Sequence, residues 1–140
     1  MSWVVDASVA AKWFFEEEFT ERARDVLQRG GDLIAPELIL LEVGSVAWKR
    51  FLRGEISGDH ARAAATALPQ ILSLLVPLSS LHERALDLAL RLGHPVYDCC
   101  YLALAEAREL PFVTADGRLL ERISAKGWPG KAVHLGKMTL

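Results

Sequence analysis

Short apolar runs alternate with longer amphipathic segments along the whole chain, and this alternation constrains the fold most. The predicted strands are residues 3–5, 33–35, 76–78, 111–114 and 132–135. Each run is rich in apolar or β-branched residues and is bounded by turn residues. Strands that are separated by helices pair in parallel through right-handed crossovers. The sequence therefore predicts an α/β fold, with an open parallel sheet covered by helices on both faces.

The predicted helices occupy most of the remaining chain. Their ranges are 8–15, 20–29, 37–53, 59–75, 80 or 81 to 92, 96–109 and 118–125. Ser8 is the expected N-cap of the first helix, because its hydroxyl can accept a bond from a free backbone amide. Pro69 is expected to kink or break the fourth helix, because proline has no amide hydrogen. Pro77 similarly favours an edge position for its strand.

Composition limits the class of protein. A length of 140 residues with 51% hydrophobic residues fits one domain spanning residues 1–140. No apolar run is long enough to span a bilayer, and residues 1–6 lack the basic region and cleavage pattern of a signal peptide. We therefore expect a cytoplasmic protein. Cys99 and Cys100 are adjacent, which disfavours both a disulfide and a zinc site. The net charge of −2 neither indicates nor excludes nucleic-acid binding.

Four of the 18 acidic residues have apolar sequence neighbours, where an unpartnered charge is unfavourable. They are Asp6, Glu42, Asp98 and Asp116. No Lys or Arg lies three or four residues from Asp6 or Asp98, so a local ion pair does not compensate these two charges. A cation bound by several carboxylates would compensate all four together.

Three of these acids also have a local structural explanation. Asp6 could cap the following helix, and Asp98 could be a first-turn acid that the helix dipole stabilises. Asp116 could be an ordinary turn residue. Glu42 has no such explanation, because it lies inside a predicted helix and Glu is almost never fully buried without a partner. Glu42 is therefore the clearest functional candidate of the four.

The predicted topology places the acids near one edge of the sheet. Asp6 and Asp116 follow the carboxyl ends of their strands, and Asp98 begins the helix that leads into strand 111–114. Ligands of open parallel sheets bind beyond the carboxyl ends of the strands. An all-oxygen site without His or Cys is typical of Mg²⁺ or Mn²⁺. Such an ion can polarise a phosphate and lower the pKa of an attacking water.

Four segments together resemble the PIN domain and, more narrowly, the VapC-type toxins of bacterial and archaeal toxin–antitoxin pairs. They are Val4–Ser8, Pro36–Val43, Tyr97–Ala105 and Phe112–Asp116. The resemblance covers nearly the whole chain, in order and at the expected spacing. It implies a three-layer α/β/α fold with strand order 3-2-1-4-5, in which the first and fourth strands are neighbours.

The resemblance also implies a function. A chain of this kind would be an endoribonuclease that hydrolyses RNA with water activated at a four-carboxylate site. Asp6, Glu42, Asp98 and Asp116 would be the catalytic and metal-binding set, with Mg²⁺ as the cofactor and Mn²⁺ as an alternative. Ser8 and Thr114 would place hydroxyl groups behind these ligands or beside the substrate. The implied partners are RNA, a small antitoxin protein and a second copy of the chain.

Other functional classes fit less well or stay open. A phosphotransferase of the haloacid-dehalogenase kind needs a second Asp two residues after Asp6, where this chain has Ser8. Receiver domains need an acidic pair after the first strand, and no glycine-rich nucleotide loop is present. Two alternatives remain: a PIN-fold binding or regulatory module that does not cut, and a PIN nuclease that acts on structured DNA or pre-ribosomal RNA.

Basic and apolar residues suggest further contacts. The candidates for the RNA backbone are Lys12, Lys49, Arg50, Arg53 and Arg118. Solvated surface charge explains each of them equally well. Leu, Ile and Val are abundant across many helices, so we expect self-association, with a twofold dimer as the default outcome. The antitoxin could alternatively cover the same apolar surface.

Overall fold

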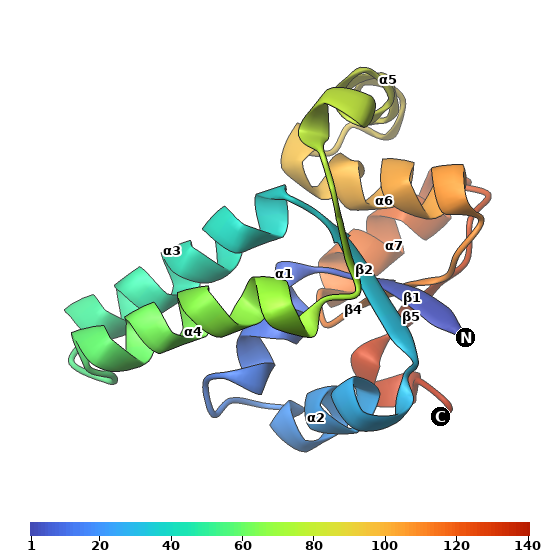
Figure 1. Ribbon diagram of the computed structural model, residues 1–140. Coiled ribbons are helices and arrows are strands. Elements are labelled where there is room, and N and C mark those ends of the chain that lie inside the picture. Colours follow the sequence, from blue (N-terminus) through green and yellow to red (C-terminus); the bar gives the residue numbers. More distant parts are fainter.

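A five-stranded parallel sheet forms the centre of the molecule (Figure 1). The computed structural model describes residues Met1–Leu140. The strands are β1 (Ser2–Val5), β2 (Asp32–Pro36), β3 (Leu74–Val76), β4 (Phe112–Thr114) and β5 (Ala132–His134). Their order is β3-β2-β1-β4-β5, and every neighbouring pair is parallel. The predicted fold class and strand order are confirmed.

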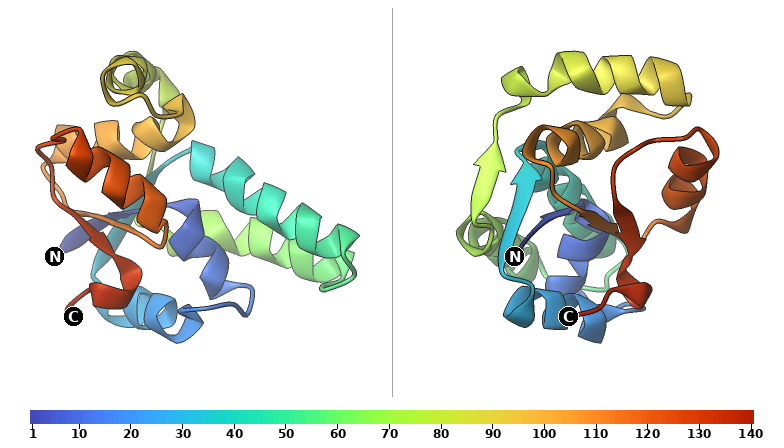
Figure 2. Two further views of the ribbon diagram at one scale, coloured as in Figure 1. Left: turned by 180° about the vertical axis from the view of Figure 1, so that it is seen from behind. Right: turned by 90° about the vertical axis from the view of Figure 1, so that its right-hand side faces the viewer.

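Helices cover both faces of this sheet. They are α1 (Ala7–Ala10), α2 (Thr20–Arg29), α3 (Leu38–Leu52), α4 (Gly58–Ile71), α5 (His82–Leu92), α6 (Val96–Arg108) and α7 (Gly117–Ala125). Figures 1 and 2 show α6 across one face with α5 outside it, and α2 on the opposite face. Helices α3 and α4 pack as a pair that projects from the sheet. No helix is both long and apolar enough to cross a bilayer.

Predicted boundaries were wrong at the start of the first helix and where the fourth helix meets the third strand. The third strand is Leu74–Val76 rather than residues 76–78. Ser8 does not cap the first helix, because Asp6 takes that position and accepts a bond from the amide of Val9 at 3.2 Å. This helix is a single turn, continued by the 3₁₀ turn η1 (Ala11–Trp13). The fourth helix ends at Ile71, two residues after Pro69, rather than at residue 75. The chain then joins the sheet, where the amide of Ser73 donates to the carbonyl of Leu33 at 2.9 Å.

The core packs against both faces of the sheet, and α6 supplies its longest run of buried residues. Val4 and Val5 of β1 are both fully buried, as expected for a parallel strand that is covered on both faces. Residues 99–105 of α6 are buried without interruption. Each large apolar side chain buried in this way contributes about 1.5–3 kcal/mol. Packing therefore fixes β1, which Asp6 directly follows, and α6, which carries Asp98.

Candidate active site

Two hydroxyl groups hold the carboxylate of Asp6 at the carboxyl edge of the sheet. Ser8 donates to its Oδ1 at 2.5 Å, and Thr114 donates to its Oδ2 at 2.5 Å. Thr114 comes from β4, which pairs directly with β1. Ser8 also accepts from the amide of Ala115 at 2.8 Å, so its hydroxyl ties the two strand ends together.

Burial perturbs Asp6 strongly. Its side chain is nearly inaccessible, and loss of water raises its pKa from the ordinary value of 3.8 to about 6. The bonds from Ser8, Thr114 and the amide of Val9 act in the opposite direction, because they favour the ionised form. The negative charge of Asp98 raises the pKa slightly further. Asp6 is therefore an acid kept near charged neighbours at an energetic cost.

Glu42 is half-buried on α3 and has a specific partner. The hydroxyl of Tyr101, on α6, donates to Glu42 Oε1 at 2.5 Å. Burial raises the pKa of Glu42, the bond from Tyr101 lowers it, and the charge of Asp98 raises it. Burial and the charge of Glu42 also raise the pKa of Tyr101, which keeps the phenol protonated as a donor. The Tyr101 ring stacks on Phe112 with 6.1 Å between centroids, which fixes its position.

Asp98 lies in the first turn of α6, and its charge acts on both Asp6 and Glu42. Its charge raises the pKa of both other carboxyl groups. Its own Oδ2 lies 2.7 Å from Nε2 of His94, four residues earlier in the chain. Three of the four predicted acids therefore share one local field.

Asp116 follows β4 and lines a cavity that Glu42 also lines. Its side chain caps α7 and accepts from the amides of Arg118 at 3.0 Å and Leu119 at 3.1 Å. Asp116 and Glu42 both line an open cavity of about 660 Å³. The other polar lining residues are Ser8, Lys12, Glu17, Ser45 and Lys49. Asp116 and Glu42 are therefore both accessible to solvent from one open space.

The donor set fits a hard divalent cation in chemical type. All four candidate ligands are carboxylates, which suit Mg²⁺ or Mn²⁺. As the side chains stand, no group of three or more Asp, Glu, His or Cys is close enough to hold one ion. Asp98 is turned to His94, and Asp116 is turned to the amides of α7. Rotation of these two side chains is the adjustment that shared binding would require.

Comparison with known proteins decides the family. The sequence profile of the PIN domain matches residues 3–126. The chain belongs to the PIN-domain family. It is 33% identical over 127 residues to the ribonuclease VapC3 of Pyrobaculum aerophilum. This match covers 89% of this chain and 97% of that protein. The predicted resemblance to PIN domains and VapC proteins is confirmed.

Solved structures share the PIN fold. Mycobacterium tuberculosis VapC20, described as a Sarcin-Ricin loop cleaving toxin, superposes with a TM-score of 0.70 at 16% identity, over 85% of this chain and 93% of that one. A chain of a toxin–antitoxin complex from Klebsiella pneumoniae superposes with a TM-score of 0.69 at 18% identity, over 94% and 96%. At these identities the likeness shows the fold alone.

The Lys and Arg side chains predicted to contact RNA differ in whether a carboxylate already pairs with them. Lys12 is buried and bonded to Glu17 at 2.9 Å, and Arg50 also pairs with Glu17. Arg53 pairs with Glu55 at 2.7 Å. A carboxylate therefore compensates the charge of each of these three. Lys49 lines the cavity and Arg118 follows Asp116, and both are exposed and outside any ion pair.

Three side chains of the site were not predicted from the sequence. His94 and Tyr101 contact Asp98 and Glu42, and Glu17 joins Lys12 to Arg50. Spacing could have indicated His94, which is four residues before Asp98. Tyr101 carried no such signal, because its partner Glu42 lies on another helix. Glu17 carried no such signal, because it belongs to a run of three glutamates in a loop.

Proposed function

We propose that this chain is a metal-dependent endoribonuclease, the toxin of a type II toxin–antitoxin system. The observation that carries the proposal is a group of mutually perturbing carboxylates, Asp6, Glu42 and Asp98, at the carboxyl edge of a PIN-domain sheet. Asp116 lines the same open cavity as Glu42. The name of the Pyrobaculum relative, a ribonuclease, supports RNA as the substrate. The Klebsiella neighbour, solved in a toxin–antitoxin complex, supports a small antitoxin as the partner.

The proposed roles follow from what holds each carboxylate. Asp6, Glu42, Asp98 and Asp116 would bind Mg²⁺ or Mn²⁺, which when bound lowers the pKa of water and offsets phosphate charge. Ser8 and Thr114 keep the Asp6 oxygens fixed against the repulsion of the other acids. Tyr101 does the same for Glu42. A carboxylate that stays ionised at neutral pH can accept a proton from the water that attacks phosphorus, and the ribose oxygen leaves.

Cleavage of labelled nucleic acids tests the function. Single-stranded RNA, structured RNA and duplex DNA, each end-labelled, are incubated with the protein in Mg²⁺ and in chelator, and the product ends are mapped. We expect endonucleolytic cuts in RNA that require the divalent ion. Binding without cuts would instead favour a regulatory PIN module. Cuts in structured DNA would change the substrate and leave the chemistry in place.

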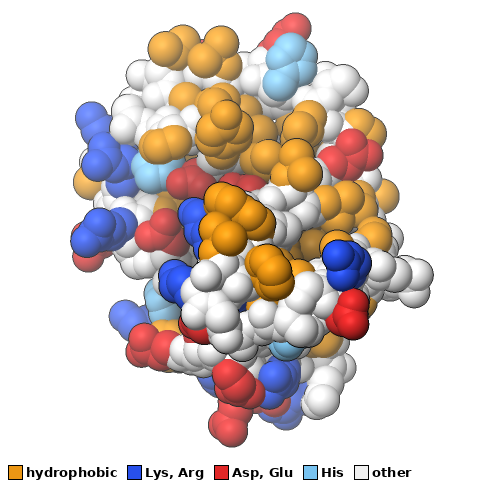
Figure 3. Space-filling model, turned by 90° about the vertical axis from the view of Figure 1, so that its left-hand side faces the viewer, with side chains coloured by type: hydrophobic (Ala, Val, Ile, Leu, Met, Phe, Trp, Pro, Cys, Tyr) orange, Lys and Arg blue, Asp and Glu red, His pale blue; other side chains and the backbone are white.

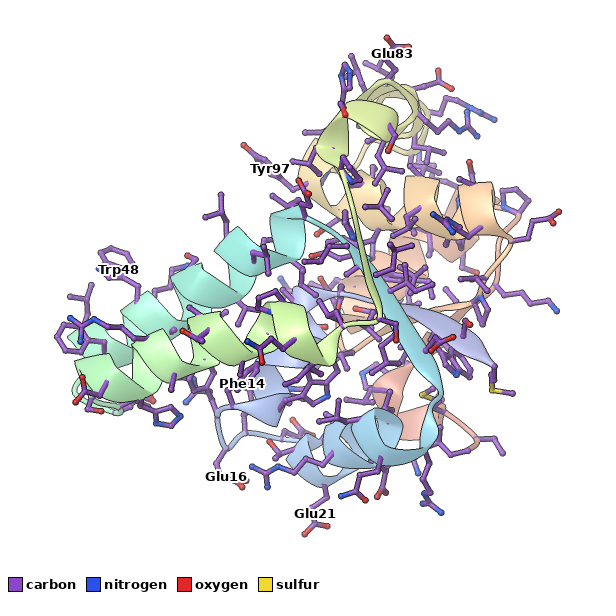
Figure 4. The ribbon with its side chains drawn as sticks, in the orientation of Figure 1. Phe14, Glu16, Glu21, Trp48, Glu83 and Tyr97 are labelled. Atoms are coloured by element: carbon purple, nitrogen blue, oxygen red, sulfur yellow. The ribbon has the colours of Figure 1, made fainter.

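We further propose that the protein is a homodimer. Leu41, Trp48 and Leu52 form an exposed stripe along α3, with 77%, 57% and 61% of each side chain accessible. Trp48 and Tyr97 project from α3 and from the start of α6 on the same side of the molecule (Figure 4). Apolar side chains gather on this face (Figure 3). Because a stripe on one helix can meet itself across a twofold axis, a second copy is the partner that this surface suits.

A further inference from the structure

Three basic side chains form a row along α7. Arg118, Arg122 and Lys126 follow one another at four-residue intervals, so they share one side of the helix and of the turn that ends it. All three are exposed. Together with Glu121 and Ala125 they line a shallow depression of about 420 Å³. We refer to these three cations as the α7 row.

The α7 row differs from most other cations in having no acidic partner. Eight of the 16 Lys and Arg side chains form an ion pair with Asp or Glu. No member of the row is among them, although Glu121 lies on the same helix. The chain has a net charge of −2, so attraction of a polyanion requires a local excess of positive charge. The α7 row supplies one.

The row lies next to the chain segments that carry two of the four site carboxylates. Asp116 caps the helix and precedes Arg118 by two residues. Arg122 Nη1 donates to the carbonyl of Gly93 at 3.1 Å, and the next residue, His94, holds Asp98. A strand bound at the carboxylates can therefore continue along α7.

We propose that the α7 row binds the phosphates of the RNA strand on one side of the scissile bond. This inference rests on the proposed ribonuclease function. Residues four apart on a helix rise by about 6 Å, which is close to the spacing of successive phosphates along an extended strand. Contacts of this kind position the strand without reading its sequence. An acidic protein segment is the other polyanion that could use the row, but continuity with the carboxylates favours RNA.

Salt-dependent binding tests the proposal. Binding of a labelled 20-nucleotide single-stranded RNA is measured by fluorescence anisotropy in chelator, between 50 and 200 mM KCl. The variant is Arg118→Gln with Arg122→Gln and Lys126→Gln. Each phosphate contact with a single strand contributes about 0.7 to the slope of log K against log salt. We expect the slope of the variant to be shallower by about 2, with affinity at 50 mM reduced on the order of tenfold or more.

A matched control removes the same charge elsewhere. Arg24→Gln with Arg29→Gln and Arg62→Gln replaces three exposed cations of α2 and α4 that already pair with carboxylates. This variant should keep the parent slope. Because Arg122 contacts Gly93, the double variant Arg118→Gln with Lys126→Gln is measured as well, and its slope should be shallower by about 1.4. This pair has no side-chain partner whose loss could unfold the protein.

The outcomes separate this inference from the proposed function. A parent that cuts RNA, with equal slopes for the α7 and control variants, would overturn the inference and leave the function standing. Unchanged RNA binding combined with lost binding of a poly-glutamate peptide would overturn it in favour of an acidic protein ligand. A parent that neither binds nor cuts RNA would contradict the ribonuclease function itself, and the inference with it.

Discussion

At the scale of single residues, the four carboxylates differ in the groups that hold them. Two hydroxyl groups hold Asp6, a phenol holds Glu42, an imidazole contacts Asp98, and backbone amides hold Asp116. Each partner partly compensates a charge that burial or repulsion disfavours. The sequence indicated which acids were unusual, and the resemblance to PIN domains implied hydroxyl groups at Ser8 and Thr114. Nothing in the sequence indicated the bond from Tyr101 to Glu42, because these residues are 59 positions apart in the chain.

Replacing Asp98 by Asn separates a catalytic role from a structural one. We expect RNA cleavage to collapse, because the variant keeps the shape of the side chain and loses one ligand charge. In chelator, the variant should melt at a higher temperature than the parent. The Asp98 charge repels those of Asp6 and Glu42, as the raised pKa values of both groups indicate, and the substitution removes this repulsion. Thermal melts beside a cleavage assay measure both effects. A folded variant that cuts at the parent rate, or an inactive one that melts well below the parent, would overturn the assignment.

The raised pKa of Asp6 predicts how stability changes with pH. A carboxyl group whose pKa rises from 3.8 to about 6 on folding stabilises the fold when it is protonated. This contribution is complete below pH 3.8 and is lost as the pH rises through about 6. Its size is about 3 kcal/mol, from 1.36 kcal/mol per unit of pKa. Denaturant unfolding of parent and Asp6→Asn is measured in chelator at pH values from 3.5 to 7. The stability of the parent relative to the variant should fall by about 3 kcal/mol over this range; parallel pH curves would contradict this expectation.

At the scale of secondary-structure elements, the sequence predicted most strongly where periodicity and breakers agree. Helix α2 was predicted at the observed bounds, because its apolar spacing ends at two glycines. The boundary between α4 and β3 was predicted wrongly, because three of the four residues 72–75 are leucine, which suits either structure. The free edge of β2 settles their conformation, and that edge exists only once the sheet has formed. Sequence periodicity alone contains no information about it.

Helix α7 provides a test of the dual role of Asp116. This residue caps the helix, and we also propose it as a metal ligand. Asp116→Asn keeps an oxygen that can accept from the amides of Arg118 and Leu119, so stability should change little while RNA cleavage falls. Asp116→Ala should lose cleavage and also about 1 kcal/mol of stability, the usual effect of removing an N-cap. Equal unfolding free energies for the two variants would argue against the cap, and full activity of Asp116→Asn against the ligand role.

At the scale of the whole molecule, the fold brings distant segments to one edge and leaves an apolar face elsewhere. The order β3-β2-β1-β4-β5 makes β1 and β4 neighbours, so residues 6 and 116 meet at the same end of the sheet. The resemblance to PIN domains predicted this adjacency, whereas composition and spacing predicted only that the strands are parallel. The exposed stripe of α3 was not predicted residue by residue, since its side chains resemble core residues in type.

The apolar face predicts a dimer that a single charge should disrupt. Trp48→Glu places a carboxylate in the centre of the exposed stripe of α3, where a partner copy would bury it. We expect the parent to be a dimer and this variant a monomer at micromolar concentration, by size-exclusion chromatography with light scattering. Gln70→Glu adds the same charge to an exposed position of α4 and should leave the dimer intact. A monomeric parent would count against the interface.

Glu42 offers the sharpest test of metal-dependent RNA cleavage at the carboxylate edge. Glu42→Gln keeps the size of the side chain and an oxygen for the hydroxyl of Tyr101, and it removes only the charge. The measurement is the RNA cleavage rate in Mg²⁺ for the parent, Glu42→Gln and the exposed control Glu18→Gln, each with the parent's circular dichroism spectrum. We expect Glu42→Gln to lose about 100-fold or more in cleavage rate, while Glu18→Gln cuts like the parent. A folded Glu42→Gln protein that cuts RNA at the parent rate would contradict it.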